Sequence, residues 1–217
     1  MKRVFAPGCA LVMHNPGSAK KLLAFLNKEL GPLDEHLTCC RHEPKLPAGT
    51  QVINVCAGCD KRYRTLYDGI ATISLWEILD RSKSFPFPDY KGKEMTVLDA
   101  CPTRDQSRIH DAVRSLLSKM NIRVVESAKT KADGVCCGDS FYGTLPVAKV
   151  KELMKKRADE MPAEDVAVYG VSCIKSMHIG GKKPRHMADL LLGNDTAAGV
   201  FEPDEWHTQL DKFINAH

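Results

Sequence analysis

The residues of this chain best suited to chemistry are its nine cysteines, because two pairs of them are adjacent in the sequence. One pair lies in LTCCRH and the other in DGVCCGD. A disulfide within such a pair closes a strained ring, and an odd number of cysteines does not suit a disulfide framework. The thiols therefore indicate metal, cluster or redox chemistry. The nine positions are Cys9, Cys39, Cys40, Cys56, Cys59, Cys101, Cys136, Cys137 and Cys173.

The cysteines recur in the same order in two halves of the chain. The first half contains RVFAPGC, the first doublet, VINVCAGCDK and ISLWEILDR, and the second contains MTVLDAC, the second doublet, VAVYGVSCIK and HMADLLLG. Each half has two apolar runs that lead to cysteines and then a short helical segment. We interpret this pattern as a duplication with its boundary near FPFPDYKGKE, residues 85–94, which predicts modules over 1–90 and 91–217.

The elements that must position these cysteines follow from the hydrophobic pattern. Short buried strands are predicted at residues 4–5, 51–55, 96–99, 122–126 and 166–169, and helices at 18–30, 105–120, 146–161 and about 203–215. Alternating strands and helices predict an α/β fold of duplicated βαβ (Rossmann-like) halves, with parallel sheets related by a pseudo-twofold axis. Cys9, Cys56, Cys101 and the stretch Gly170–Cys173 all follow predicted strands, where ligands of such sheets gather.

The composition disfavours several other classes of protein. Hydrophobic residues make up 43% and charged residues 27%, as in ordinary globular proteins. No apolar run approaches the roughly 18 residues of a membrane span, and basic residues alternate with acidic ones, so neither a membrane span nor a nucleic-acid partner is expected. Pro7-Gly8 interrupts the apolar start, which predicts a cytoplasmic protein without a signal peptide. The basic stretch GGKKPRH, residues 180–186, is interpreted as a solvated turn.

The five cysteines of the first half are too many for a single zinc ion. CAGC is a C-x-x-C motif, which zinc sites and thioredoxin-like dithiols share. Tetrahedral zinc leaves one of the five thiols without a role, and a dithiol explains only Cys56 and Cys59. A polynuclear iron–sulfur cluster can use all five, because thiolates can terminate or bridge several irons. The candidate first site is Cys9, Cys39, Cys40, Cys56 and Cys59.

The second half has one ligand fewer. Gly170 stands where the first cysteine of a C-x-x-C motif would be. Four thiolates suit a cubane [4Fe–4S] cluster, zinc or a modified noncubane cluster, or the site is degenerate and empty, and these alternatives stay open. The candidate second site is Cys101, Cys136, Cys137 and Cys173.

The duplicated order of one cysteine, a doublet and a C-x-x-C motif resembles the cysteine-rich CCG domain family, which includes the B subunit of heterodisulfide reductase. The resemblance spans nearly the whole chain, and CCG itself stands at residues 136–138. It implies a noncubane [4Fe–4S] cluster at the first site. Two departures are Arg41 in place of the glycine after the first doublet and a short spacer between Cys40 and Cys56, which predicts a more open first site.

The resemblance implies an oxidoreductase of the disulfide-reductase kind or an electron-transfer subunit. The expected partners are an electron-donor protein (a ferredoxin, a flavoprotein or a sister reductase subunit) and a disulfide or thiol substrate. The alternative is a non-catalytic zinc or iron–sulfur scaffold or assembly subunit. Among the weaker candidates, His110 and His178 are read as structural histidines rather than ligands. The other weaker candidates are three cations close in sequence to the cysteines, whose positive charge would offset the negative charge of the thiolates: Lys61, Lys175 and Arg104.

Overall fold

The computed structural model describes residues 2–217, which form two compact units. Unit 1 comprises the residues up to Phe85 together with Gln209–His217, and unit 2 comprises Pro86–Thr208. The change of unit after Phe85 lies in the stretch where the sequence predicts the duplication boundary. The last residues of the chain differ from the expectation, because they cluster with the first unit and not with the second.

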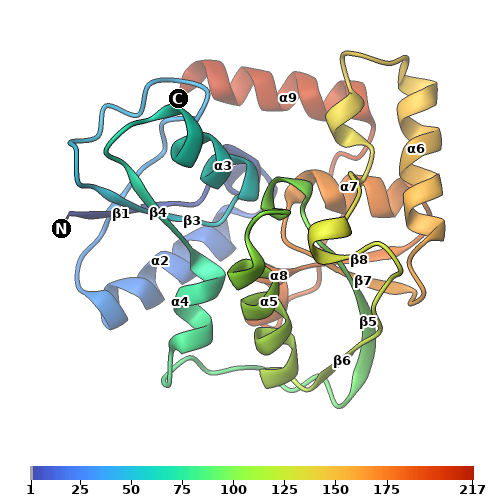
Figure 1. Cartoon of the computed structure of the whole chain (residues 1–217), viewed down its shortest axis with the longest axis horizontal. Coiled ribbons are helices and arrows are strands. Elements are labelled where there is room, and N and C mark those ends of the chain that lie inside the picture. Colours follow the sequence, from blue (N-terminus) through green and yellow to red (C-terminus); the bar gives the residue numbers. More distant parts are fainter. Residues whose placement is uncertain (1) are drawn as a thin grey trace. The chain divides into compact units, whose positions relative to one another are not determined.

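Unit 1 is a parallel sheet with helices (Figure 1). Its strands are β1 (Arg3–Ala6), β2 (Asp34–Glu35), β3 (Gln51–Asn54) and β4 (Ala71–Ser74), in the order β2-β1-β3-β4. Its helices are α1 (Cys9–His14), α2 (Pro16–Leu30), α3 (Ala57–Leu66) and α4 (Leu75–Arg81).

Unit 2 repeats this topology. Its strands are β5 (Lys93–Leu98), β6 (Ile122–Val124), β7 (Asp165–Val168) and β8 (Lys183–His186), all parallel in the order β6-β5-β7-β8. Its α-helices are α5 (Ser107–Lys119), α6 (Val147–Asp159), α7 (Val171–Ile179) and α8 (Met187–Leu191). Short 3-10 helices are η1 (Cys101–Thr103), η2 (Lys131–Asp133) and η3 (Asp139–Phe141). The predicted duplicated α/β fold is confirmed, whereas the pseudo-twofold relation stays a prediction.

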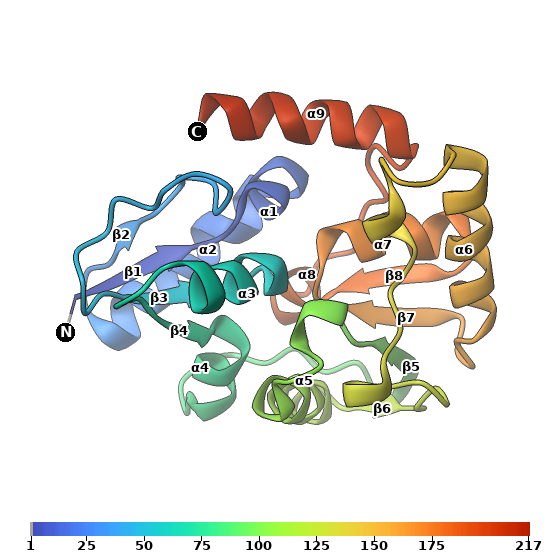
Figure 2. The ribbon, with the colours of Figure 1, turned by 45° about the horizontal axis from the view of Figure 1, so that its top comes forward.

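Each sheet has a point at which the strand order reverses. From β1 the chain passes to β2 on one side, and from β3 it passes to β4 on the other side. Right-handed crossovers in opposite directions place α2 and α3 on different sides of the sheet (Figure 2). Register pairs Ala6 with Asn54, and Leu98 with Val168 in unit 2, so the carboxyl ends of the central strands are level. In open α/β sheets this switch point is where ligands bind.

Amphipathic helices and buried strands form the core of each unit. The central strands are apolar, and Val52, Ile53 and Val97 are fully buried. Helix α5 buries one stripe of side chains at helical spacing against the sheet, as its sequence predicts. That stripe consists of Ile109, Val113, Leu116 and Leu117. The loops that follow the central strands are therefore anchored by a buried strand at one end and by a helix at the other.

The outer strands β2, β4 and β8 were not predicted from the sequence. The stretch that we interpreted as a solvated basic turn contains β8, which pairs with β7 along its whole length. Pro184 lacks an N–H group and is tolerated because β8 is an edge strand. The basic side chains of β8 form ion pairs there, among them Arg185 with Asp165. The turn interpretation is therefore corrected to an edge strand.

The glycine of the CCG sequence is explained by helix α6. Gly138 has φ +108, and a Cβ placed there would lie 2.8 Å from the Cγ of Met154 and 3.0 Å from its backbone nitrogen. Unit 1 has no helix between its doublet and β3 in the described chain. Arg41 occupies the corresponding position there and is not among the residues of the described chain that have positive φ. The glycine is thus required by the packing of α6 rather than by the doublet itself.

Replacing Gly138 by alanine is expected to destabilise unit 2 by about 2–4 kcal/mol, because a left-handed backbone and an overpacked contact both add cost. The matched control is Gly143→Ala, which also has positive φ (+81) but no heavy atom of the described chain within 4 Å of the added Cβ. The control should lose about 1–2 kcal/mol. Urea titrations compare the two, and equal losses would mean that the contact with Met154 has no energetic cost.

Candidate functional site

The sequence of unit 1 places its five cysteines at the switch point of the sheet. Cys9 is the first residue of α1, just after β1, and Cys56 is the N-cap of α3, just after β3. Cys59 lies in the first turn of α3, so C-x-x-C is a helix start rather than a free turn. Cys39 and Cys40 enter from the loop between β2 and β3. Elements from three parts of the unit therefore supply thiols.

The five thiols form one hydrogen-bonded group. Burial, and then a hydrogen bond donated to Cys39, raises the pKa of Cys9 to about 12. Hydrogen bonding from Cys59 lowers the pKa of Cys40, and the same thiol lowers the pKa of Cys56 to about 6. The pKa of Cys59 is correspondingly raised, mainly by its hydrogen bond to Cys40. The predicted first-site residues are thus brought together.

Backbone groups favour negative charge at this group of thiols. The N–H groups of Gly58 and Cys59 donate to the sulfur of Cys56 at the positive end of α3. Gly8, which precedes Cys9, has φ +82, and a Cβ there would lie 2.9 Å from the Cβ of Cys56 and 3.6 Å from the Sγ of Cys59. Glycine at this position keeps the loop close to the two sulfurs.

Unit 2 brings its four cysteines together in the same way. Cys101 begins η1 after β5, and Cys173 lies in the first turn of α7 after β7. Cys136 accepts hydrogen bonds, first from Cys101 and then from Cys137, and these lower its pKa. Cys137 also donates to Cys173, and hydrogen bonding to Cys136 is the main reason for its raised pKa. All nine cysteines of the chain are free thiols.

The two doublets have the same local geometry. The backbone N–H of Arg41 donates to the Sγ of Cys39 at 3.5 Å, and that of Gly138 donates to the Sγ of Cys136 at 3.3 Å. Ser140 adds a second contact, with its Oγ 2.8 Å from the Sγ of Cys136. The duplication therefore extends to the hydrogen bonds of the first sulfur in each doublet.

Gly170 occupies the position of Cys56. Both residues are N-caps, of α7 and α3 respectively, and both follow the second central strand of their sheet. A Cβ at Gly170 would lie 3.5 Å from the Sγ of Cys173, and its φ of −134° is accessible to any residue. The cysteine group of unit 2 therefore lacks the thiol that Cys56 supplies in unit 1, although the backbone position is the same.

The first group is covered by the end of α9 (Pro203–Ala216), and the openness expected from its short spacer is not found. Leu210, Phe213 and Ile214 pack on the apolar cluster that contains Cys9, Cys39, Cys40 and Cys59. The His42 Nε2 lies 3.0 Å from the backbone oxygen of Ile214, and Arg41 pairs with Asp211 at 3.1 Å. Cys40 is only 8% exposed as a result. In unit 2 the helix packed behind the corresponding doublet is α6.

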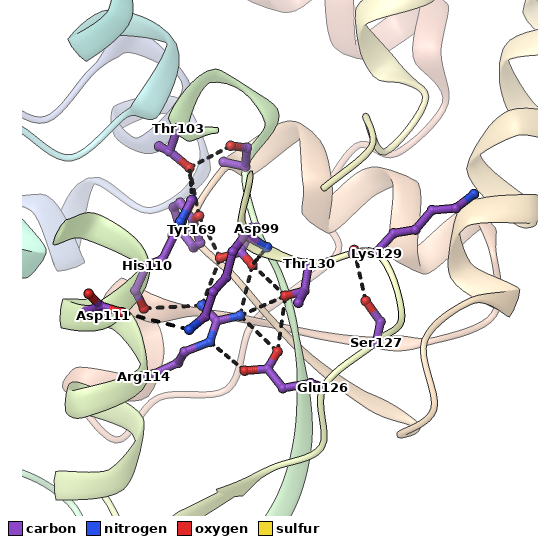
Figure 3. A network of polar contacts seen from close by, with 12 residues as sticks. Asp99, Thr103, His110, Asp111, Arg114, Glu126, Ser127, Lys129, Thr130 and Tyr169 are labelled. Atoms are coloured by element: carbon purple, nitrogen blue, oxygen red, sulfur yellow. Dashed lines mark hydrogen bonds and ion pairs between the residues drawn. The ribbon is translucent and has the colours of Figure 1, made fainter. Parts of the chain in front are cut away.

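The doublet loop of unit 2 is held by a buried polar network (Figure 3). Asp99, two residues before Cys101, accepts two hydrogen bonds from Arg114 and further ones from Thr130, Tyr169 and the N–H of Lys131. Thr130 and Lys131 belong to the segment that leads to Cys136. Burial raises the pKa of Asp99, but these donors outweigh it, so the pKa lies below its ordinary value. Sequence reasoning missed this network, although an Asp directly after a buried strand was its signal.

The weaker candidates have other contacts. His110 is buried, with Nε2 3.2 Å from the Oγ1 of Thr103, and His178 is exposed against the ring of Phe201. Lys175 is buried, donates to the backbone oxygen of Ala198 and lies over the ring of Trp206, and burial lowers its pKa to about 8. These two histidines and this lysine thus have structural contacts.

Charge near the thiols comes instead from arginines. Lys61 is exposed, although its place in the sequence matches that of Lys175. Hydrogen bonding to Cys136 and burial raise the pKa of Cys101, and the charge of Arg104 offsets only part of this; Arg62 donates from Nε to the backbone oxygen of Cys40 at 3.0 Å. Of the three cations considered from the sequence, Arg104 is therefore the one that acts on a thiol.

The donor set suits a polynuclear cluster better than a single ion. Thiolates are the usual ligands of iron–sulfur clusters, and five of them meet at one sheet edge. Between residues 2 and 217, no group of three or more Cys, His, Asp or Glu side chains has the arrangement of a metal-ion site. The suitability of this site for a cluster therefore depends on the type, number and proximity of its thiols.

None of the family models, curated proteins and solved structures with which the chain was compared matches it. The helices described between residues 2 and 217 include none with the length and apolar composition that a bilayer crossing requires.

Proposed function

We propose that this chain is an iron–sulfur component of an oxidoreductase, which passes electrons to a disulfide or to a partner protein. A noncubane-type [4Fe–4S] cluster would be held by Cys9, Cys39, Cys40, Cys56 and Cys59. Such a cluster supplies one-electron chemistry when it is bound. The observation that carries the proposal is the meeting of five free thiols at the switch point of a parallel sheet.

The residues of unit 1 are arranged to support anionic ligands. The start of α3 directs N–H groups at Cys56, and the charge of Arg62 acts on Cys40. Both effects favour thiolates, which are the form that binds metal. The apolar side chains of α9 exclude water from the doublet, which protects a site of this kind from hydrolysis and oxidation.

Unit 2 would hold a second, different centre. Its four thiols are one short of the first set, and they suit a cubane [4Fe–4S] cluster or zinc. Cys101 and Cys136 are half-buried, whereas Cys137 and Cys173 are buried. We propose this more accessible group as the place where substrate or a partner's electrons meet the chain, with a ferredoxin, a flavoprotein or a sister subunit as donor.

Anaerobic purification followed by iron, sulfide and zinc analysis tests the proposal. A brown protein with about four iron and four sulfide per occupied site is expected, and a paramagnetic signal should appear in one redox state. A colourless protein that contains only zinc would overturn it in favour of a non-catalytic scaffold. A protein that binds neither metal after reconstitution would overturn both.

A further inference from the structure

Helix α9 begins in unit 2 and ends in unit 1. It is one unbroken helix over Pro203–Ala216 (Figure 2), and its residues from Gln209 onward cluster with unit 1. The chain that leads to it from α8, residues 192–202, contains no helix or strand. The first half of α9 can therefore be described by its contacts within unit 2, and the second half by its contacts within unit 1.

The first half of α9 contacts the loop that follows the doublet of unit 2. The ring of His207 stacks on that of Tyr142, with the ring centroids 3.9 Å apart and an interplanar angle of 3°. The Nε2 of His207 lies 3.0 Å from the Oδ1 of Asp139, and the hydroxyl of Tyr142 donates to the Oδ1 of Asp204 at 2.7 Å. Asp139 is the second residue after Cys137. The start of α9 is thus attached directly to the doublet loop of unit 2.

A buried aromatic side chain anchors this half of the helix. Trp206 is buried in unit 2, and the Nζ of Lys175 lies 4.8 Å from the centroid of its ring. Pro203, in the first turn of α9, is also buried. A cation over the face of an indole adds an electrostatic attraction to the burial of the ring. The first half of α9 therefore has a firm attachment.

The second half of α9 is held more weakly, although it covers the doublet of unit 1. Of its three apolar side chains on that cluster, Ile214 is buried, whereas Leu210 and Phe213 are half-buried. The side chains of the ion pair between Arg41 and Asp211 are 51% and 59% exposed, and exposed pairs of this kind contribute little to stability. A helix end with so few buried contacts opens locally at a lower free energy than the core.

We propose that the second half of α9, residues 209–216, is a lid over the thiols of Cys39 and Cys40, and that the doublet loop of unit 2 governs how often this lid opens. With the lid closed, Cys39 and Cys40 are only 4% and 8% exposed, so metal and oxidants reach them when it opens. Because α9 is a single helix, the contacts of its first half with Tyr142 and Asp139 favour the closed position of the lid. Access to the thiols of unit 1 thus depends on the doublet loop of unit 2.

The test measures how fast iodoacetamide, a small uncharged reagent, alkylates the full-length chain in its metal-free, reduced form. The cysteine thiolate attacks the methylene carbon of the reagent, a C–S bond forms and iodide leaves, while the thiol proton goes to solvent. Mass spectrometry of the peptide that contains Cys39 and Cys40 gives the rate at the first doublet. The peptide that contains Cys173, which is buried in unit 2, is the internal reference. Because no cluster takes part, failure of the proposed function does not alter the result.

Phe213→Ala should raise the rate at the first doublet about threefold to tenfold, because it removes part of the apolar contact that holds the lid closed. Lys212→Ala is the matched control, since Lys212 is exposed on the same helix and alanine is the best helix former. The control should leave the rate unchanged. An unchanged rate in Phe213→Ala would show that α9 is not a lid.

The dependence on unit 2 is tested by variants far from Cys39 and Cys40 in the sequence. Tyr142→Ala and His207→Ala each abolish the stacked pair, so each should raise the rate at the first doublet about twofold to tenfold and leave the rate at Cys173 unchanged. Thr144→Ala is the matched control, because the hydroxyl of Thr144 donates within the same loop, to the backbone oxygen of Phe141. It should change neither rate. An unchanged rate at the first doublet in either variant, or an equal rise at Cys173, would overturn the proposal.

Discussion

Replacing Cys40 by alanine is expected to remove the noncubane cluster of unit 1 and to lower the iron content of the chain, while leaving the fold in place. Cys40 is the central thiol of its group, because it accepts hydrogen bonds from Cys59 and Cys39 and interacts electrostatically with Cys56 and Cys9. Without the Cys40 thiol, the other four thiols of the group lose the ligand that interacts with all of them. The variant should lose the absorption and paramagnetic signal of the first cluster, measured together with iron content.

The fold should survive because the hydrogen bonds that hold the loop at residue 40 to α3 and Tyr67 are made by its backbone oxygen. The backbone oxygen of Cys40 accepts from Arg62 and from the hydroxyl of Tyr67, and alanine keeps both hydrogen bonds. Cys137→Ala is the matched control, since it changes the same doublet position in unit 2. It should leave the first cluster intact. A Cys40→Ala protein with its full iron content would exclude the five-thiol ligand set.

The convergence of the cysteines could be predicted because it depends on local signals. Apolar runs end just before Cys9, Cys56 and Cys101, and parallel strands end at a common edge. The matching of Cys56 with Gly170 followed from the repeated spacing and agrees with their shared N-cap positions. Strand β8 was missed because KPRH has no apolar alternation and contains proline.

The covering of the first site could not be predicted, because it depends on contacts distant in the sequence. Leu210, Phe213 and Ile214 follow helical spacing, so an amphipathic helix was expected near 203–215. The pattern says that this face is buried but not on which element it packs. The same holds for Arg114 and Glu126, whose charges indicate exposed surface until their positions beside Asp99 are known.

Replacing Asp99 by asparagine is expected to destabilise unit 2 by about 2–4 kcal/mol at neutral pH. The carboxylate, with a side chain only 1% exposed, accepts five hydrogen bonds. Asparagine would turn an N–H₂ group toward the donors of Arg114 and Thr130 and would leave buried groups without acceptors. Hydrogen exchange of β5 and β7 should accelerate, while β1 and β3 serve as the internal reference.

The control is Glu126→Gln, which removes the other carboxylate paired with Arg114. Its side chain is 40% exposed, so the loss of stability should stay below about 1 kcal/mol.

The pH dependence of stability distinguishes the contribution of the Asp99 charge from the contribution of its packing. The folded state lowers the pKa of Asp99 below 3.8. The charged carboxylate therefore contributes to the free energy of unfolding at neutral pH, and this contribution is lost as the pH falls through the pKa of the folded state. The difference between the native chain and Asp99→Asn should therefore shrink below about pH 4. A difference that is constant from neutral to acid pH would show that the stabilisation comes from packing and not from the carboxylate charge.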